Sequence, residues 1–247
     1  MPLLNREIPI IADKVIDLKF GTGALKVTPA HDLIDWEIGL RHQLPAVLII
    51  NGSGKMTKES KICEGLTPLE CRQKVIEELK KRNLIERIEE YIHSLPFCYR
   101  CHSLIEPLAS QQWFLEMDEL AKVAIKAVKE KEIRFTPKNF EKIYFEWLKN
   151  IKDWCISRQL WWGHKIPLEK SEDVLDTWFS SALWPLATLG WPEKTSDLKK
   201  FYPTDILCTD RGIINLWVTR MIFSGMEFMK KKPFKNIYIN ATVLTKD

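Results

Sequence analysis

The spacing of hydrophobic positions predicts alternating strands and helices in the first part of the chain. Three apolar or alternating runs are typical of strands: residues 6–13 (REIPIIAD), 20–29 (FGTGALKVTP) and 45–50 (PAVLII). Residues 30–42, between the last two runs, have helical spacing. The glycines within 20–29 indicate a strand whose backbone closely approaches another group.

Further helices are indicated by periodicity and by signals at their ends. Thr67 supplies an N-cap, Pro68 the first helical position and Glu70 the third, so a helix is expected from here to about Asn83. Apolar spacing predicts three more helices, over residues 117–132, 139–150 and 171–184. By contrast, the aromatic segment 154–167 is irregular and is expected to form a junction.

The C-terminal part of the chain has the pattern of a strand, a helix and a second strand. These elements are expected over residues 205–208, 213–229 and 236–243. Such a unit forms a right-handed crossover between parallel strands, and ligands of open α/β sheets bind beyond the carboxyl ends of the strands. The loop 209–212 is therefore a candidate ligand contact, although an ordinary loop in a core unit fits the pattern equally well.

Length and composition indicate a folded chain with more than one unit. The 247 residues exceed the usual size of one domain, and 45% hydrophobic residues with ten Trp can build a core. The net charge of +4 favours an anionic partner without identifying it. Neither a secretion signal nor a long apolar run is present, so we expect no membrane insertion, a cytoplasmic location and reduced thiols.

The first group of residues that suggests chemistry lies in residues 21–35 (GTGALKVTPAHDLID). A predicted strand that carries Lys26 and Thr28 leads into a helix that carries Asp32 and Asp35. The two carboxylates are three residues apart, so both can lie on one helical face beside the cation and the hydroxyl. The alternative is that Asp32 only caps the helix, where the helix dipole favours negative charge.

The string GTGALKVTPAHD closely resembles the editing-domain signature of valyl-tRNA synthetases. In that family the domain hydrolyses threonine that is wrongly attached to the valine tRNA. A hydrophobic pocket poorly rejects an isostere that only adds a hydroxyl, so a second, polar site is needed. The resemblance implies that Asp35 holds the substrate ammonium group and that Lys26, Thr28 and Asp32 surround its hydroxyl, while positioned water attacks the ester.

The cysteine pair Cys98 and Cys101 supplies two of the four ligands that a closed zinc site needs. Similar synthetases carry such a pair, and a second pair commonly follows the segment that matches GHKIP. Here only residues 168–171 follow that segment, so the second pair is expected to be deleted. His93 and His102 are conceivable substitutes, and two reduced cysteines without zinc are the alternative.

Two later strings, DTWFSSALWP and YPTDILCTDRGIINLWVTRMIFSGMEFM, also resemble the valine enzymes. The resemblance implies that Trp178, Ile213 and Trp217 line the amino-acid pocket. The family has Gly-x-Asp in the adenylate loop, whereas this chain has Asp210 and Gly212 in the reverse order. The transposition predicts weaker activation, unless the loop is shifted so that Asp210 itself reaches the ribose.

Together, these features predict an α/β architecture, with a remnant of the editing domain and the second half of a doubly wound, parallel-sheet (Rossmann-like) nucleotide-binding domain. The predicted division places the partial editing domain and its connection in residues 1–150, and the catalytic half in residues 151–247. The family's His-Ile-Gly-His and Lys-Met-Ser-Lys-Ser motifs, which bind ATP, are absent from the sequence.

The resemblance implies that the parent enzyme attaches valine to its tRNA and hydrolyses mischarged threonyl-tRNA. Its expected partners are valine, ATP with magnesium, the valine tRNA and the missing parts of the same synthetase. The chain alone is expected to be inactive. Two alternatives stay open: a stand-alone editing deacylase, and a non-enzymatic relic that binds tRNA.

Overall fold

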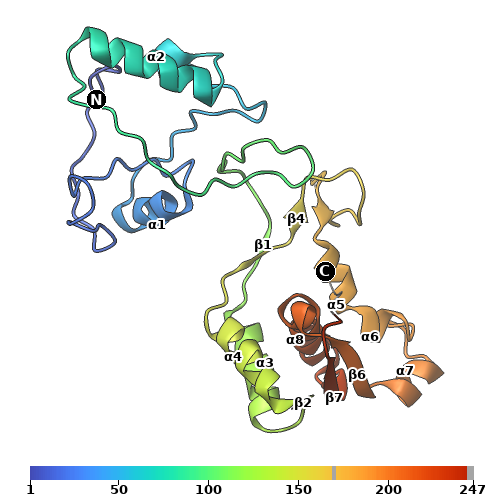
Figure 1. Cartoon of the computed structure of the whole chain (residues 1–247). Coiled ribbons are helices and arrows are strands. Elements are labelled where there is room, and N and C mark those ends of the chain that lie inside the picture. Colours follow the sequence, from blue (N-terminus) through green and yellow to red (C-terminus); the bar gives the residue numbers. More distant parts are fainter. Residues whose placement is uncertain (169–170, 244–247) are drawn as a thin grey trace. The chain divides into compact units, whose positions relative to one another are not determined.

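The structure, a computed structural model, describes residues 1–168 and 171–243 (Figure 1). The chain divides into two compact units, Met1–Gln111 and Gln112–Asp247. None of the helices in the described part has the length and the apolar character needed to traverse a bilayer.

The N-terminal unit contains two α-helices, α1 (Leu33–His42) and α2 (Pro68–Lys81), and a 3₁₀ turn over Lys58–Cys63. The helix predicted from Thr67 is confirmed together with its capping box. The Thr67 hydroxyl accepts from the Glu70 amide, and the Glu70 carboxylate accepts from the Thr67 amide at 2.7 Å. The helix predicted over residues 30–42 is also confirmed, with its start three residues later.

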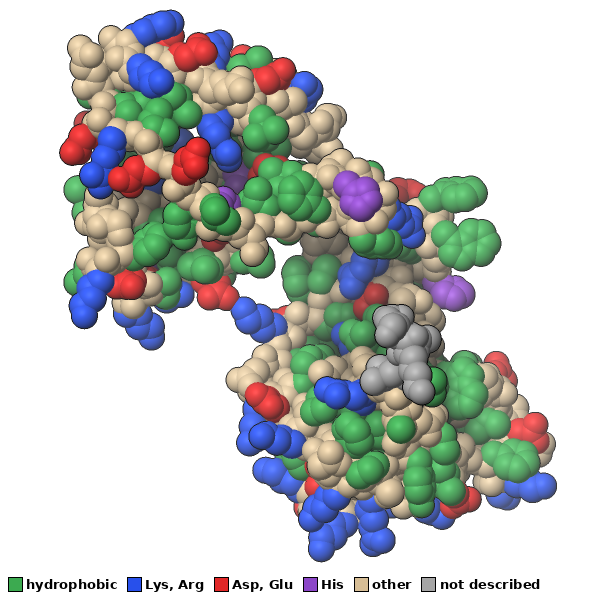
Figure 2. Space-filling model, viewed as in Figure 1, with side chains coloured by type: hydrophobic (Ala, Val, Ile, Leu, Met, Phe, Trp, Pro, Cys, Tyr) green, Lys and Arg blue, Asp and Glu red, His purple; other side chains and the backbone are tan. Residues whose placement is uncertain are grey.

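The three strands predicted in the N-terminal unit are wrong. Residues 6–13 and 20–29 form no strand, and in 45–50 only Ile50 takes part in an isolated bridge, to Met56. A strand is stable only when a neighbouring strand satisfies its backbone. No described strand pairs with residues 6–13 or 20–29, and the contacts of 45–50 with residues 56–57 are too few to form a strand. Apolar side chains such as Ile10 are therefore exposed, and Figure 2 shows hydrophobic side chains on the surface of both units.

One pair of thiols in this unit differs from the sequence-based expectation. Cys63 ends the 3₁₀ turn and Cys71 lies in the first turns of α2, so their Cα atoms are 5.1 Å apart and the two sulfurs form a disulfide. The expectation of reduced thiols is therefore wrong for Cys63 and Cys71. Four cysteines remain as free thiols: Cys98, Cys101, Cys155 and Cys208.

The C-terminal unit is built on a parallel sheet of β2 (Arg134–Thr136), β7 (Phe234–Asn240) and β6 (Thr204–Asp210), in that order. The helix α8 (Thr219–Met229) follows β6 and precedes β7, which confirms the predicted strand, helix and strand. The parallel pairing confirms the predicted α/β fold class. The three-residue β2 was not predicted from the sequence.

The C-terminal unit also contains further helices and short strands. The helices are α3 (Asp118–Lys129), α4 (Glu141–Lys149), α5 (Thr177–Ala182), α6 (Trp184–Ala187) and α7 (Ser196–Phe201). Two antiparallel pairs of two-residue strands join β1 (Phe114–Leu115) to β3 (Trp154–Cys155), and β4 (Ser157–Arg158) to β5 (Val174–Leu175). A 3₁₀ turn precedes α4 (Lys138–Phe140), and a 3₁₀ turn (Arg211–Ile213) and a π-helix (Ile214–Val218) precede α8.

These elements confirm the helices predicted over 117–132 and 139–150. The helix predicted over 171–184 begins only at Thr177, because Val174 and Leu175 pair with β4 instead. The predicted junction, 154–167, contains the short strands β3 and β4 and is otherwise irregular.

The core of the C-terminal unit lies between one face of the sheet and the helices α3, α4 and α8. Alternation along the strands buries Leu207, Ile237 and Ile239, whereas Ile206 and Tyr238, on the opposite face, are exposed. The Tyr144 hydroxyl is buried in this core and donates to the Ala124 carbonyl at 2.8 Å, so α4 is bonded to α3.

The compact division does not coincide with the boundary predicted at residue 150. The helices α3 and α4 and strand β2 share the sheet and core of the C-terminal unit, so packing divides the chain after Gln111. The assignment of residues 1–150 to an editing domain and its connection stays a prediction.

Candidate functional sites

The polar residues predicted from residues 21–35 lie beside the start of α1. The Thr28 amide donates to Asp35 Oδ2 at 2.6 Å, and Lys26 Nζ donates to Thr28 Oγ1. Asp35 is buried, Thr28 is half-buried, and Lys26 is exposed. The structure thus brings an ammonium group, a hydroxyl and a buried carboxylate into one hydrogen-bonded chain, which can recognise a small polar ligand.

Asp32 has a different position from these three residues. Its Oδ1 accepts from the Ile34 amide at 2.8 Å and from the Asp35 amide at 2.9 Å, at the N-terminus of α1. Asp32 is therefore the N-cap of α1, and its predicted contact with a substrate hydroxyl stays a prediction. The cap fixes the first turn of α1 and with it the backbone of Asp35.

His31, in the same string, was not identified from the sequence as a functional residue. Its Nε2 accepts from the Ile49 amide at 2.9 Å, so Nδ1 carries the proton and donates to the Pro107 carbonyl at 3.0 Å. The imidazole thus joins three segments of the N-terminal unit. Its partners lie 18 and 76 residues away in the sequence, and no local spacing could have indicated them.

The two candidate zinc ligands lie on a tight turn of the N-terminal unit. The Cys98 amide donates to the Ser103 carbonyl at 2.9 Å, and the Cys101 thiol donates to Ser103 Oγ at 3.3 Å. The Ser103 hydroxyl is the main reason that the pKa of Cys101 is lowered to about 7, with help from the Ser103 amide and from Cys98.

The rest of a zinc site is not formed by the side chains that the structure describes. Within residues 1–168 and 171–243, no group of three or more His, Cys, Asp or Glu side chains could hold a metal ion. His93 and His102 do not complete a ligand set with the two cysteines, and two thiolates do not close a tetrahedral site. Residues 168–171 stand where the second cysteine pair is expected to be deleted, and residues 169–170 lie outside the part of the chain that the structure describes.

The candidate amino-acid pocket is in the C-terminal unit. Trp178 lies in α5, and Trp217 lies in the π-helix that precedes α8. The Trp217 indole donates from Nε1 to the Ser181 carbonyl of α5 at 2.9 Å, so the two segments that carry the predicted pocket residues are bonded to each other. Ile213 is half-buried directly before the π-helix.

The transposed residues of the loop lie at the carboxyl end of β6. Asp210 pairs with Asn240 of β7, and its Oδ1 accepts from the Gly212 amide at 2.6 Å. A Cβ atom on Gly212 would lie 2.9 Å from this Oδ1, so a side chain there would displace the carboxylate. Asp210 is exposed at the edge of the sheet where ligands of open α/β folds bind.

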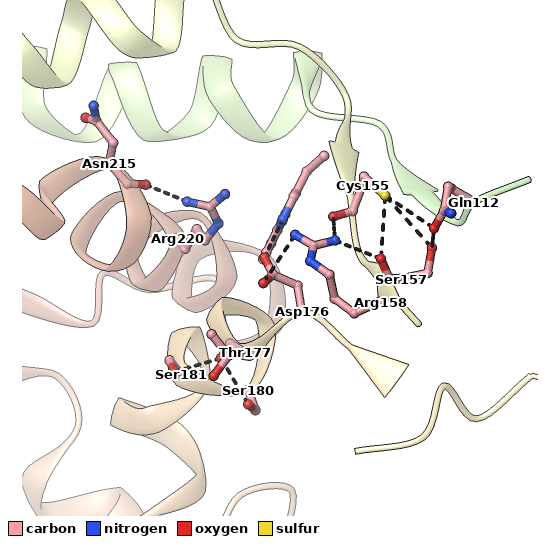
Figure 3. Close-up of polar contacts among 11 residues, drawn as sticks. Gln112, Cys155, Ser157, Arg158, Asp176, Thr177, Ser180, Ser181, Asn215 and Arg220 are labelled. Carbon is pink, nitrogen blue, oxygen red and sulfur yellow. Dashed lines mark hydrogen bonds and ion pairs between the residues drawn. The ribbon is translucent and has the colours of Figure 1, made fainter. Parts of the chain in front are cut away.

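A cavity of about 530 Å³ opens between α4, β3, α5 and α8 within the same unit. Its walls include Trp154, Trp178, Arg158 and Arg220. Asp176, also in its wall, accepts from Trp154 Nε1 at 2.9 Å and forms an ion pair with Arg158 at 3.3 Å (Figure 3). Because Asp176 directly precedes α5, these contacts fix the start of the helix that carries Trp178.

The parallel sheet, with candidate residues at its carboxyl edge, is shared by a large group of nucleotide-binding enzymes, and comparison with known proteins identifies the family. The model for tRNA synthetases class I (I, L, M and V) matches residues 27–169 and 167–247. The chain therefore belongs to the class I tRNA synthetases.

Among curated proteins, the chain is similar to valine–tRNA ligases. It is 48% identical to those of Clostridium tetani and Thermotoga maritima, over 98% and 100% of its own length. The chain spans only 31% and 32% of the length of these relatives. Among solved structures, Mycobacterium tuberculosis methionyl-tRNA synthetase in complex with methionyl-adenylate covers 61% of this chain, at 15% identity and a TM-score of 0.49.

Proposed function

We propose that the chain is part of a valine–tRNA ligase, which attaches valine to its tRNA at the expense of ATP and hydrolyses mischarged threonyl-tRNA. The observation that carries the proposal is the bond from Trp217 to α5, because it joins two segments that both resemble the valine enzymes. Similarity to valine–tRNA ligases over nearly the whole chain supports it.

In the proposed activation site, Trp178, Ile213 and Trp217 would form the apolar wall that selects a small branched side chain. At the carboxyl end of β6, Asp210 would add charge beside the adenylate phosphate, and Gly212 would leave the ribose without the carboxylate that the family's loop supplies. ATP with magnesium would supply the activated phosphate in the complete enzyme. The described side chains offer no cluster of metal ligands, so we assign neither magnesium nor zinc to them.

In the proposed editing site, Asp35 would hold the ammonium group of the threonyl ester, and Lys26 and Thr28 would contact its hydroxyl. Asp32 would also contact this hydroxyl, in addition to capping the first turn of α1. No protein nucleophile is required, because water can attack an ester that is held in place. The valine tRNA, valine and the remaining parts of the synthetase are the partners of this scheme, and the cytoplasm is its proposed location.

A chimera tests the proposal. Residues 1–247 replace the matching region of the Clostridium tetani ligase, and pyrophosphate exchange is measured with valine and with isoleucine. We expect weak exchange that prefers valine, since a pocket discriminates one methylene by about 10- to 200-fold. Trp178→Ala in the same chimera should reduce the preference for valine. A folded chimera that activates isoleucine as well as valine, or neither, would contradict the proposal.

A further inference from the structure

Arg220 is a buried arginine that none of the proposed reactions uses. It lies in α8 and is 7% exposed, with its guanidinium group 4.2 Å from the ring centre of Trp154 and 5.5 Å from that of Trp147. Its Nη1 donates to the Asn215 carbonyl at 2.7 Å, whereas its Nε has no hydrogen-bond partner among the described residues. Burial is the main reason that the pKa of Arg220 is lowered.

The other cation of the cavity differs from Arg220 in its partners. Arg158 donates to the Cys155 and Ser157 carbonyls at 2.8 Å and is paired with Asp176. Arg220 forms no ion pair in the part of the chain that the structure describes, although it lines the same cavity. Figure 3 shows the Arg220 guanidinium group bonded to the Asn215 carbonyl, and Arg158 bonded to Asp176. A buried cation with few partners is costly unless an anion compensates it.

We infer that this cavity binds a carboxylate group, which Arg220 receives between the indole rings of Trp147 and Trp154. A guanidinium group matches the planar geometry of a carboxylate and binds it with two parallel hydrogen bonds. Asp153 and Asp176 also line the cavity, so their charges disfavour a dianion such as a phosphate monoester. The indole walls provide contact for a small apolar group attached to the carboxylate.

The carboxylate has two possible sources, a free small acid or an acidic side chain of another polypeptide segment. The inference rests on the geometry of the C-terminal unit and not on the proposed ligase function, although Trp178 of the proposed amino-acid pocket also lies in the wall of this cavity. The chain spans less than a third of its relatives, so a side chain supplied by the remaining parts of such a protein is chemically equivalent to a free acid. The experiment separates the two sources.

Binding is measured on the isotopically labelled chain by NMR, with sodium acetate as the probe and sodium chloride at equal ionic strength as the reference. We expect acetate to shift the indole signals of Trp147 and Trp154 in a saturable way, and to leave the exposed Trp161 unchanged. Arg220→Lys, which keeps the charge but loses the planar fork, should weaken binding by about tenfold. Arg220→Met should abolish the shift, and Arg134→Met, an exposed arginine on β2, should leave it intact.

Equal shifts with acetate and chloride in the unmodified chain would overturn the inference, and this result does not depend on any variant being folded. A folded Arg220→Met that still binds acetate would also overturn it. The titration is then repeated on the chimera. Persistence of acetate binding identifies a free acid as the ligand, whereas its loss identifies an acidic side chain of the added parts. Failure of the chimera to activate valine would contradict only the proposed ligase function.

Discussion

Exchange of the two transposed loop residues is the most direct test of the adenylate site. In the chimera, four forms are compared: the original loop, Asp210→Gly, Gly212→Asp, and both changes together. The double change restores the order Gly-x-Asp that resembles the family pattern. We expect it to recover most of the activity, and either single change to recover less.

The structure gives a physical reason for this order. The bond from the Gly212 amide to Asp210 Oδ1 is 2.6 Å long, and a hydrogen bond to a charged group contributes about 1.5–3 kcal/mol. A carboxylate at position 212 could accept a hydrogen bond from a ribose hydroxyl. If this bond is made in the transition state, it should raise the rate of activation by about ten- to a hundredfold. Of the two single variants, Gly212→Asp should recover less, because its Cβ would lie 2.9 Å from Asp210 Oδ1 and would bring two carboxylates together.

Valine-dependent pyrophosphate exchange, with thermal unfolding as a control for folding, distinguishes the outcomes. Higher activity of the double variant than of both single variants supports the reasoning. Equal activity of the original and the double variant would refute it, because Asp210 would then already serve the ribose from its present position.

Four further predictions concern the N-terminal unit. In the chimera, Asp35→Ala should allow threonyl-tRNA to accumulate while valine activation stays normal, and clearance of mischarged tRNA at the original rate would refute its role. The pKa of Asp13 is lowered from 3.8 to about 2, chiefly by a hydrogen bond from the Val15 amide, so its stabilising effect is complete above about pH 4 and is lost as the pH falls toward 2. Thermal unfolding of the original chain and of Asp13→Asn should therefore differ at pH 6 and converge near pH 2; a constant difference would contradict this. Because the pKa of Cys101 is lowered to about 7, this thiol should react with iodoacetamide at pH 7 faster than the exposed Cys208. Protein purified without chelator should hold less than one equivalent of zinc, as measured by atomic emission, because Cys98 and Cys101 supply only two ligands.

Helices could be predicted from the sequence more reliably than strands because the signals of a helix are local. Thr67 and Glu70 lie three residues apart and satisfy each other's backbone, whatever the rest of the chain does. The apolar run 6–13 has no such local partner, and its backbone would need a neighbouring strand. The strand β2 shows the opposite failure, since only its pairing with β7 defines its three residues.

The candidate sites could be predicted in composition but not in detail. The side chains of Lys26, Thr28 and Asp35 lie close together, as residues 21–35 predicted, because the three residues are near one another in the sequence. The cavity around Arg220 could not be predicted, since its walls come from segments between Met117 and Arg220 that are far apart in the sequence and meet only after folding. The partners of His31 were hidden for the same reason.

The order of strands in the sheet has a consequence for synthesis on the ribosome. β7 lies between β2 and β6, yet it is the last of the three to be made. Until residues 234–240 have left the ribosome, β2 and β6 have no strand to pair with, and the apolar residues of α8 have only part of their final surroundings. The C-terminal unit therefore cannot complete its fold during translation until this last strand emerges, and a chain that stops before Phe234 would expose both edges to chaperones and proteases.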